Sequence, residues 1–373
     1  MKKILFICGS AEPGKDGVGD YTRRLAAALV GKGYKVTIIA LADKFANELV
    51  TEVQHVEDSA VSIIRIPKKI GTSTKKNSIK SFVKENKPDW ISLQYVPQAF
   101  EKRGLVFTLI SILKSIPIGP SWHFMIHEIA VPKRGVIQRL IRIIQQSLLQ
   151  QLYRQLKPKL VHTSITWYQL ALQNLGISST ILPLFSNIPY ISGTKKMANK
   201  QVFTIGFFSR VNSSAYIITS LEYLATKAAK AGLKIHIVLI GGDLEINKAF
   251  MSLIREHKQI NATCQATGYL SPTELSEQLT NCQLGICPTK FSLLGKSGSF
   301  AAFVEHGVPV LAPNNTNLKV SNSDFSNYKV FTHTNQLPPL ETFEANKPIP
   351  LLDIVVKTFL TNMQTNNAEY NAI

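Results

Sequence analysis

Short runs of strand-type residues alternate with helical patterns along most of this chain, and the alternation restarts once after a polar segment. This order predicts parallel sheets covered by helices. In the first half, the expected strands are KILFIC (3–8), KVTIIAL (35–41), SIIRI (62–66), WISLQY (90–95), HFMIH (123–127) and LVHTS (160–164). Residues 1–195 are therefore expected to form one doubly wound α/β domain.

The polar segment SGTKKMANKQ (192–201) has the composition of a linker. A second domain is expected over 200–345, in which Ser271, Pro272 and Glu274 predict a capped helix start. Residues 346–373 are expected to contain a tail helix that can pack back on the first domain. The expected fold class is α/β, with two Rossmann-like doubly wound domains facing a central cleft, and 373 residues suit two such cores. Ligands of such sheets bind beyond the carboxyl ends of the strands.

The composition favours a globular protein, because 45% of the residues are apolar and 18% are charged. No apolar run is long enough to span a bilayer, and the apolar run at the N-terminus is too short for a signal peptide. The four cysteines form no CxxC pair, and Cys282 and Cys287 have the surroundings of small core residues. These features predict a reduced, cytoplasmic protein.

Positive charge is concentrated in the first half. Residues 1–200 contain 29 Lys and Arg against 12 Asp and Glu, a net +17 of the chain's +18. Such a half attracts phosphates, acidic polymers or an anionic bilayer. Nucleic acid is not the expected partner, because zinc-finger, RNP-type and basic recognition-helix patterns are absent. The segment 134–159 is a basic amphipathic helix that either lies on a membrane or covers the sheet.

A glycine-rich loop follows the first strand, in GSAEPGKDGVGDYTRRL. Gly14, Gly17 and Gly19 would let the backbone approach a ligand closely, although a plain flexible turn has the same composition.

Cations follow two strands of the second domain. Arg210 ends the segment GFFSR, and Lys296 precedes a helix that begins at Ser297, Gly298 and Ser299. A guanidinium fork, an ammonium group and free helix amides together could neutralise a diphosphate. The alternative is an ordinary helix cap beside solvated surface cations.

His127 and Glu128 close a first-domain strand and are expected to face the cleft, whereas His123 is expected to pack within the strand. His127 is a candidate hydrogen-bond partner for substrate or a general base, with a structural histidine as the alternative. DxD and HExxH motifs are absent, and the GKS in LLGKSGS lacks the upstream glycine of a Walker motif. We therefore expect neither a catalytic metal nor a cofactor.

Seven segments together resemble a known family. DGVGDYTRRLAAAL, the HE that closes a strand, LPLFSNIP, GFFSRV, LIGGD, ATGYLSPTELSEQL and EHGVPVLAP occur in the order seen in retaining glycosyltransferases of family four, which have the GT-B fold. The resemblance implies a nucleotide-diphosphate sugar, such as a UDP-sugar, held mainly by the second domain, and an acceptor held by the first.

The resemblance also implies individual roles. Arg210 would contact the donor diphosphate, Gly17 and Val18 its phosphate or sugar, His127 the transferred sugar or acceptor, and Gly268 and Tyr269 the nucleobase. Asp20, Tyr21 and Glu128 are the expected acceptor contacts.

Two glutamates typical of the family are missing, since Leu294 and Ala302 occupy their positions. The usual lysine after the arginine is also absent. Lys296 could supply that charge, and Glu305 could reach a ribose hydroxyl.

The favoured hypothesis is a retaining, metal-independent transferase of the hexosyltransferase type. A nucleotide-sugar epimerase and a catalytically silent nucleotide-binding homologue stay open. The basic half predicts an anionic or lipid-linked acceptor, and a location at the inner face of the membrane is open beside a fully cytoplasmic one.

Overall fold

The computed structural model describes residues 2–131, 135–193, 201–314, 325 and 327–368. Contacts divide the chain into two compact units, one of Met1–Pro183 with Leu352–Ile373 and the other of Leu184–Leu351. Each unit contains a largely parallel sheet flanked by helices, which confirms the predicted fold class of two Rossmann-like α/β domains. The first unit ends at Pro183, before the boundary expected at residue 195, and most of the predicted linker at 192–201 lies outside the described residues.

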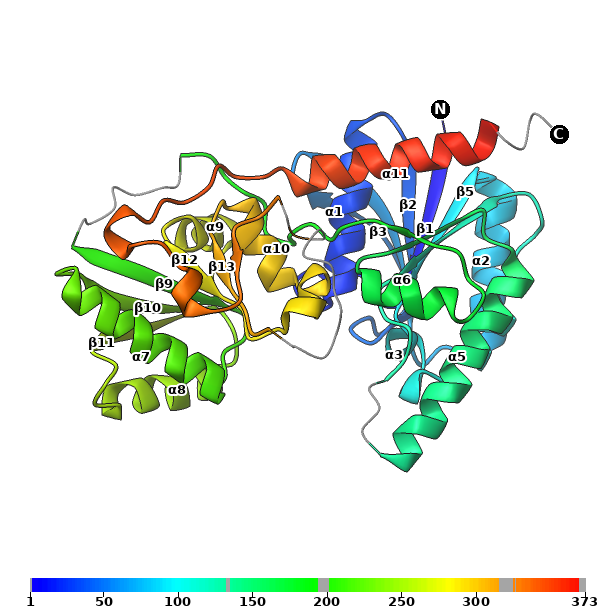
Figure 1. The fold of residues 1–373 in the computed structure, drawn as a ribbon. Coiled ribbons are helices and arrows are strands. Elements are labelled where there is room, and N and C mark those ends of the chain that lie inside the picture. The colour runs from blue at the N-terminus through cyan, green and yellow to red at the C-terminus, as the bar shows by residue number, and fades with distance from the viewer. Residues whose placement is uncertain (1, 132–134, 194–200, 315–324, 326, 369–373) are drawn as a thin grey trace. The chain divides into compact units, whose positions relative to one another are not determined.

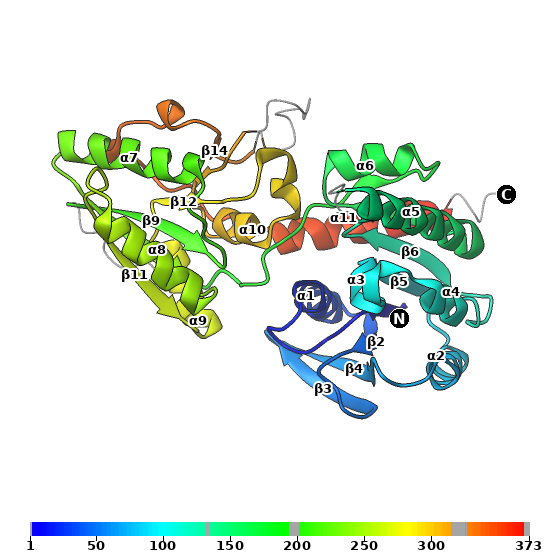
Figure 2. The same cartoon turned by 90° about the horizontal axis from the view of Figure 1, so that it is seen from below.

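The first unit is built on an eight-stranded sheet in the order β3-β4-β2-β1-β5-β6-β7-β8. Figure 2 labels five of these strands, β2 to β6. Its elements are β1 (Lys3–Cys8), α1 (Gly17–Gly31), β2 (Lys35–Asp43), β3 (Val50–Val56), β4 (Ser59–Pro67), α2 (Thr72–Asn86), β5 (Trp90–Tyr95), α3 (Pro97–Phe100), α4 (Phe107–Leu113), β6 (Ser121–Ile126), α5 (Val136–Leu156), β7 (Leu160–Thr163), α6 (Thr166–Gln173), β8 (Thr180–Ile181) and α11 (Leu351–Ala368).

The central strands of this sheet are covered on both faces, and all six residues of β5 are buried. This burial explains why they appear in the sequence as apolar runs rather than as alternating patterns. The edge strand β3 was missed from the sequence. It pairs antiparallel with β4, and its alternate residues are exposed, so VTEVQHV lacks a continuous apolar run.

The second unit has a six-stranded sheet in the order β11-β10-β9-β12-β13-β14, all of it parallel. Its elements are β9 (Val202–Phe208), α7 (Ala215–Lys230), β10 (Lys234–Ile240), α8 (Leu244–Glu256), β11 (Ala262–Gly268), α9 (Pro272–Thr280), β12 (Leu284–Ile286), α10 (Gly298–Glu305), β13 (Val310–Leu311) and β14 (Val330–Phe331). The capping box predicted at Ser271 and Glu274 is confirmed at the start of α9.

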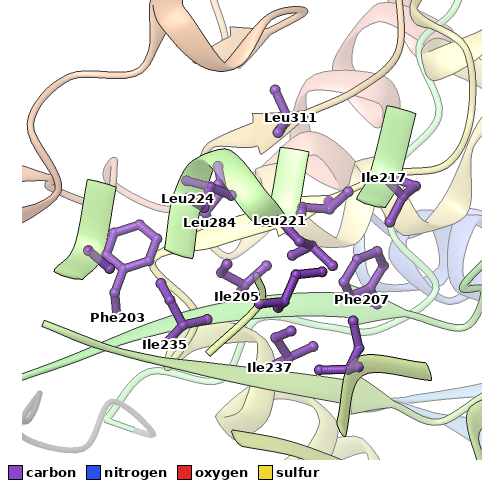
Figure 3. Close-up of a cluster of buried hydrophobic side chains, with 14 of the residues drawn as sticks. Phe203, Ile205, Phe207, Ile217, Leu221, Leu224, Ile235, Ile237, Leu284 and Leu311 are labelled. Carbon is purple, nitrogen blue, oxygen red and sulfur yellow. The ribbon is translucent and has the colours of Figure 1, made fainter. Parts of the chain in front are cut away.

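The core of the second unit includes side chains of the sheet, of α7 and of α8. Figure 3 shows Ile205 and Phe207 of β9 facing Ile217 and Leu221 of α7. These four side chains are at most 1% exposed, so the carboxyl end of β9 is held by packing.

The C-terminal helix α11 packs on the first unit. The ring centroid of Phe359 lies 6.3 Å from that of Phe6 in β1 and 5.0 Å from that of His123 in β6. The last helix of the chain therefore covers the sheet built by its first residues (Figure 1). The helix extends from Leu351 to Ala368, inside the segment 346–373 where a tail helix is expected.

Two sequence predictions need correction at their boundaries. The strand predicted over 123–127 is β6, which ends at Ile126, so His127 lies in the following loop. The helix predicted over 134–159 is α5, which starts at Val136 and ends at Leu156, and Arg134 lies outside the described residues. Among the described residues, every helix is too short or too polar to cross a membrane.

Candidate functional site

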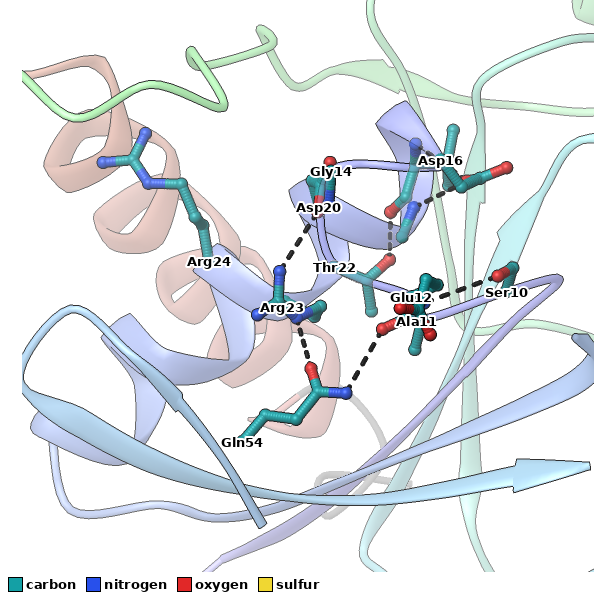
Figure 4. A network of polar contacts seen from close by, with 12 residues as sticks. Ser10, Ala11, Glu12, Gly14, Asp16, Asp20, Thr22, Arg23, Arg24 and Gln54 are labelled. Atoms are coloured by element: carbon teal, nitrogen blue, oxygen red, sulfur yellow. Dashed lines mark hydrogen bonds and ion pairs between the residues drawn. The ribbon is translucent and has the colours of Figure 1, made fainter. Parts of the chain in front are cut away.

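The loop between β1 and α1 ends on an Asp16 cap. The carboxylate of Asp16 accepts hydrogen bonds from the amides of Val18, at 3.1 Å, and Gly19, at 2.8 Å (Figure 4). The Val18 amide, which the resemblance assigns to the donor, is thus bonded to Asp16 in this structure. Gly17 is exposed at the first position of the helix.

Gly19 has a packing role that the sequence did not indicate. A Cβ at this position would collide with the carbonyl oxygen of Ser10, so only glycine lets the first turn of α1 lie against the end of β1. Gly14 has a φ of 69° and open space around it, which fits the turn interpretation of this loop.

The same loop is hydrogen-bonded to Asp43, which is in turn bonded to Arg65. Asp43 accepts hydrogen bonds from the Ser10 hydroxyl at 3.1 Å, the Ala11 amide at 3.2 Å and Arg65 Nε at 2.8 Å. Burial alone would raise the pKa of Asp43, but these bonds and the amide of Phe45 hold the pKa below its ordinary value. The carboxylate therefore stays ionised and fixes the path of the loop.

Asp20 and Tyr21 lie in the first turns of α1. Asp20 accepts from the Gly14 amide at 3.0 Å and from Arg23 at 3.1 Å, while burial raises its pKa. Tyr21 is buried, and its ring meets the ring of His127 edge-on with centroids 5.0 Å apart. This contact brings the start of α1 to the end of β6.

His127 is 6% exposed, and its Nε2 donates to Gln94 Oε1 at 2.9 Å. Burial lowers the pKa of His127 to about 3, so the imidazole is neutral at physiological pH. A group with this pKa is a weak general base, which favours the hydrogen-bonding interpretation over proton abstraction. With Nε2–H occupied, Nδ1 is the nitrogen that can accept a hydrogen bond. Glu128, the next residue after His127, is half-buried.

A chain of buried polar side chains starts at His127 and crosses the first unit. Gln94 Nε2 donates to Ser92 Oγ at 2.8 Å, and Ser92 Oγ lies 2.8 Å from His123 Nδ1. His123 Nε2 lies 3.0 Å from His162 Nδ1, and His162 Nε2 lies 2.9 Å from Asn362 Nδ2 on α11.

The donor and the acceptor in each of these histidine hydrogen bonds follow from Asn362. Asn362 donates through Nδ2, so His162 Nε2 accepts and its Nδ1 carries the proton. His162 then donates to His123 Nε2, which places the His123 proton on Nδ1, facing Ser92. Burial lowers the pKa of His123 well below its ordinary value and that of His162 to about 4, so both imidazoles are neutral.

Sequence reasoning missed Ser92, Gln94, His162 and Asn362. One signal was available for the first two. Ser92 and Gln94 are two residues apart within the apolar strand WISLQY, so they point to the same face, where a buried polar pair needs partners.

In the second unit, the start of α10 is fastened to the end of β9. Ser299 Oγ donates to the carbonyl oxygen of Phe208 at 2.9 Å, two residues before Arg210. Arg210 is exposed, and its guanidinium has no partner among the described residues. The structure thus brings Arg210 and the predicted anion-binding helix start to one edge of the sheet.

The first turn of α10 has amides available for an acceptor. Ser297 caps the helix by accepting from the Phe300 amide at 3.3 Å, whereas the amides of Gly298 and Ser299 have no acceptor in the described part of the chain. Lys296 is half-buried immediately before the cap. Uncommitted amides and the positive end of a helix favour an anion at this position.

Gly268 and Tyr269 lie at the carboxyl end of β11, two strands from β9 in the same parallel sheet. The φ of Gly268 is 68°, and the Tyr269 side chain is 99% exposed. An aromatic ring in this position is free to stack on a base.

Glu305 is at the other end of α10. It is 4% exposed, and its carboxylate accepts from the amide of Ser186 at 3.0 Å. Leu294 and Ala302, which occupy the positions of the family glutamates, are fully buried. Ribose binding by Glu305 stays a prediction, and its carboxylate already has a partner inside the fold.

A groove of about 470 Å³ lies elsewhere, between Lys114, which follows α4, and the second half of α5. Because α5 runs from the carboxyl end of β6 toward the amino end of β7, this groove is away from the strand ends that hold the predicted site residues. The described residues contain no group of three or more His, Cys, Asp or Glu side chains placed to hold a metal ion.

No protein-family model matches this sequence, and no curated protein matches it. Among solved structures, it is similar to sucrose-phosphate synthase from Thermosynechococcus elongatus, with 11% identity, a TM-score of 0.57 and coverage of 100% of this chain and 99% of that one. The catalytic domain of starch synthase IV from Arabidopsis thaliana gives 11% identity, a TM-score of 0.57 and coverage of 98% of both chains. A putative UDP-N-acetylglucosamine 2-epimerase from Listeria monocytogenes gives 10% identity, a TM-score of 0.56 and coverage of 99% of this chain and 98% of that one.

Identities this low show the fold alone. The two synthases are GT-B glycosyltransferases, and the match to both covers nearly the whole of each chain. The class that fold and sheet topology define is therefore the GT-B fold, with two Rossmann-like domains.

Proposed function

We propose that this protein transfers a sugar, of the hexose type, from a nucleotide-diphosphate sugar such as a UDP-sugar to an acceptor. The main support for this proposal is the junction of β9 and α10, where Ser299 donates to the Phe208 carbonyl oxygen, two residues before the exposed Arg210. The junction offers a guanidinium and two uncommitted amides at one strand end. Similarity of fold to nucleotide-sugar transferases supports the proposal.

In this proposal Arg210 and Lys296 stabilise the departing nucleoside diphosphate. The leaving group gains negative charge as the glycosidic bond to phosphate breaks, and preorganised donors lower the energy of that state. The amides of Gly298 and Ser299 add the positive end of α10. Arg210 and Lys296 would neutralise the leaving diphosphate, which is a role that a divalent metal ion can also fill. The reaction is therefore proposed to need no metal.

The first unit is proposed to hold the acceptor. Neutral His127 would accept a hydrogen bond through Nδ1 from a hydroxyl of the sugar or acceptor, and Asp20, Tyr21 and Glu128 are the other proposed acceptor contacts. Retention of configuration is the expectation from the family resemblance. The excess of positive charge in residues 1–200 favours an anionic or lipid-linked acceptor at the inner face of the membrane.

Arg210 provides the test. A thermal-shift screen against UDP, GDP, ADP and TDP sugars would first identify the donor. With that donor, Arg210→Ala is expected to lower kcat by about 10²–10³-fold, because one charged donor to the leaving group is lost. Arg210→Lys should recover part of the loss, since charge is kept without the fork.

Arg255 offers a matched control, because it is another exposed arginine of the second unit, in the last turn of α8. Arg255→Ala is expected to leave turnover unchanged. Full activity of Arg210→Ala would exclude the proposed role of Arg210.

The epimerase hypothesis has one specific observation in its favour, the similarity of fold to the putative 2-epimerase. Product analysis without an acceptor separates the two reactions, because an epimerase converts the donor alone. Calorimetric donor binding without hydrolysis or transfer across a broad acceptor panel would instead favour a silent homologue.

A further inference from the structure

The first half of α5 exposes large aliphatic side chains to solvent. Val136 is 82% exposed, Ile137 71%, Leu140 60% and Ile143 62%. On a helix these positions lie on one side, while the buried side begins only at Gln145. Figure 1 shows this end of α5 reaching beyond the other elements of its own unit. We call Val136, Ile137, Leu140 and Ile143 the α5 apolar face.

This face lies in a basic, acid-free part of the chain. No Asp or Glu occurs between Glu128 and Glu222, whereas that stretch contains 11 Lys and Arg. Arg139 is exposed beside the apolar face. The middle of α5 also touches a basic loop, because Gln145 Nε2 donates to the carbonyl oxygen of Arg103 at 2.6 Å, and Lys102 and Arg103 are exposed.

We propose that the α5 apolar face docks the protein on an anionic lipid bilayer. Four exposed aliphatic side chains gain free energy by entering the acyl boundary, and the exposed Arg139 beside them gains from anionic headgroups. Apolar burial and electrostatic attraction both add to the binding of a helix that lies in the plane of a membrane. Docking agrees with the membrane-side acceptor proposed above, but it does not depend on donor binding or sugar transfer, so failure of vesicle binding and failure of the Arg210 test are separate results.

Other occupants fit the surface less well. Nucleic acid would match the arginines but would leave the aliphatic side chains without an apolar partner. A second copy docking through the same face would bring together two positively charged helices, and α5 has no carboxylate to offset the repulsion.

The test is co-sedimentation of the full chain with phosphatidylglycerol or phosphatidylcholine vesicles. Binding to phosphatidylglycerol vesicles is expected at low salt and should weaken at least about tenfold in high salt, because the charge attraction is screened. The Leu140→Gln/Ile143→Gln double variant is expected to bind at least about tenfold more weakly at low salt.

A matched control exists on α8, where Leu244 is 57% and Ile246 54% exposed. Leu244→Gln/Ile246→Gln makes the same chemical change outside the α5 apolar face and should bind vesicles like the wild type. Equal loss in both double variants, no loss in either, or no binding by the wild type would overturn the proposal.

Insertion can be seen directly with Ile137→Trp. Its tryptophan emission, measured as a difference from the wild type, should shift to the blue with phosphatidylglycerol vesicles, whereas Ile246→Trp should not shift. Light scattering that finds self-association of the wild type, abolished in Leu140→Gln/Ile143→Gln, would assign the face to a second copy and overturn the proposal.

Discussion

Buried imidazoles in the first unit bind protons poorly, because charge is costly away from water. His127 has a pKa of about 3 and His162 of about 4, against about 6.5 for an unperturbed histidine. The chain from His127 to Asn362 therefore works as a set of neutral dipoles that fixes the orientation of His127. A neutral His127 with Nδ1 as its acceptor is the form expected to meet substrate.

This geometry predicts how stability depends on pH. The folded pKa values lie below the unfolded value, so the unfolded chain binds protons first, and stability present above about pH 6.5 is lost as pH falls toward 4. Each buried histidine contributes a slope of up to about 1.4 kcal/mol per pH unit. Hydrogen exchange of first-unit peptides at pH 7 and pH 5 would measure the loss.

A variant without a titrating group at one position provides the comparison. His162→Gln should be less stable at pH 7, because hydrogen bonds in the chain change, but should lose less stability between pH 7 and pH 5. If the variant lost as much stability between pH 7 and pH 5 as the wild type, His162 would bind protons as readily in the folded protein as in the unfolded chain. Imidazole ¹⁵N spectra should also place the proton of His123 on Nδ1 and that of His127 on Nε2.

Individual site residues were only partly predictable. Arg210 and the start of α10 could be placed together, because both follow parallel strands of one sheet, whose carboxyl ends meet at one edge. Asn362 could not be paired with His162, because the contact joins residues 200 positions apart and depends on how α11 returns to the first unit.

At the level of elements, α1 contains two glycines that differ in the space available for a Cβ atom. Gly19 packs so closely on Ser10 that a Cβ would meet backbone, whereas the nearest atom to a Cβ at Gly31 would be Ser59 Oγ at 3.8 Å. Gly19→Ala is expected to cost about 1–3 kcal/mol through overpacking. Gly31→Ala is expected to gain up to about 1 kcal/mol through helix propensity.

Thermal unfolding of the two variants would measure this difference. The melting temperature should fall for Gly19→Ala and stay level or rise for Gly31→Ala. A rise for both would show that the first turn of α1 can move away from β1, and the close packing at Ser10 would then be dispensable.

Elements with a strong local signal were predicted well. The strand KILFIC matches β1 over Lys3–Cys8, and the Ser271 capping box marks the start of α9. The strand β3 was missed because its stability comes from pairing with β4 rather than from its own sequence. His127 was placed inside a strand because apolar periodicity does not fix where a loop begins.

At the scale of the whole molecule, the chain's last helix completes its first unit. Phe359 is fully buried, against Phe6 of β1 and His123 of β6, and Asn362 ends the polar chain that starts at His127. The first unit is thus assembled from both ends of the sequence. It therefore combines Met1–Pro183 with Leu352–Ile373, whereas the second unit is continuous in sequence.

Phe359→Ala should therefore destabilise the first unit selectively, by about 3–5 kcal/mol, because it leaves a cavity against β1 and β6. Hydrogen exchange should rise in peptides from β1 and β6 and stay unchanged in peptides from β9. Ile354→Ala is the control on the same helix, since Ile354 is partly exposed and its loss should cost below about 1 kcal/mol. If exchange rose equally in both units, α11 would stabilise the molecule as one cooperative body, and the division into two units would not hold in solution.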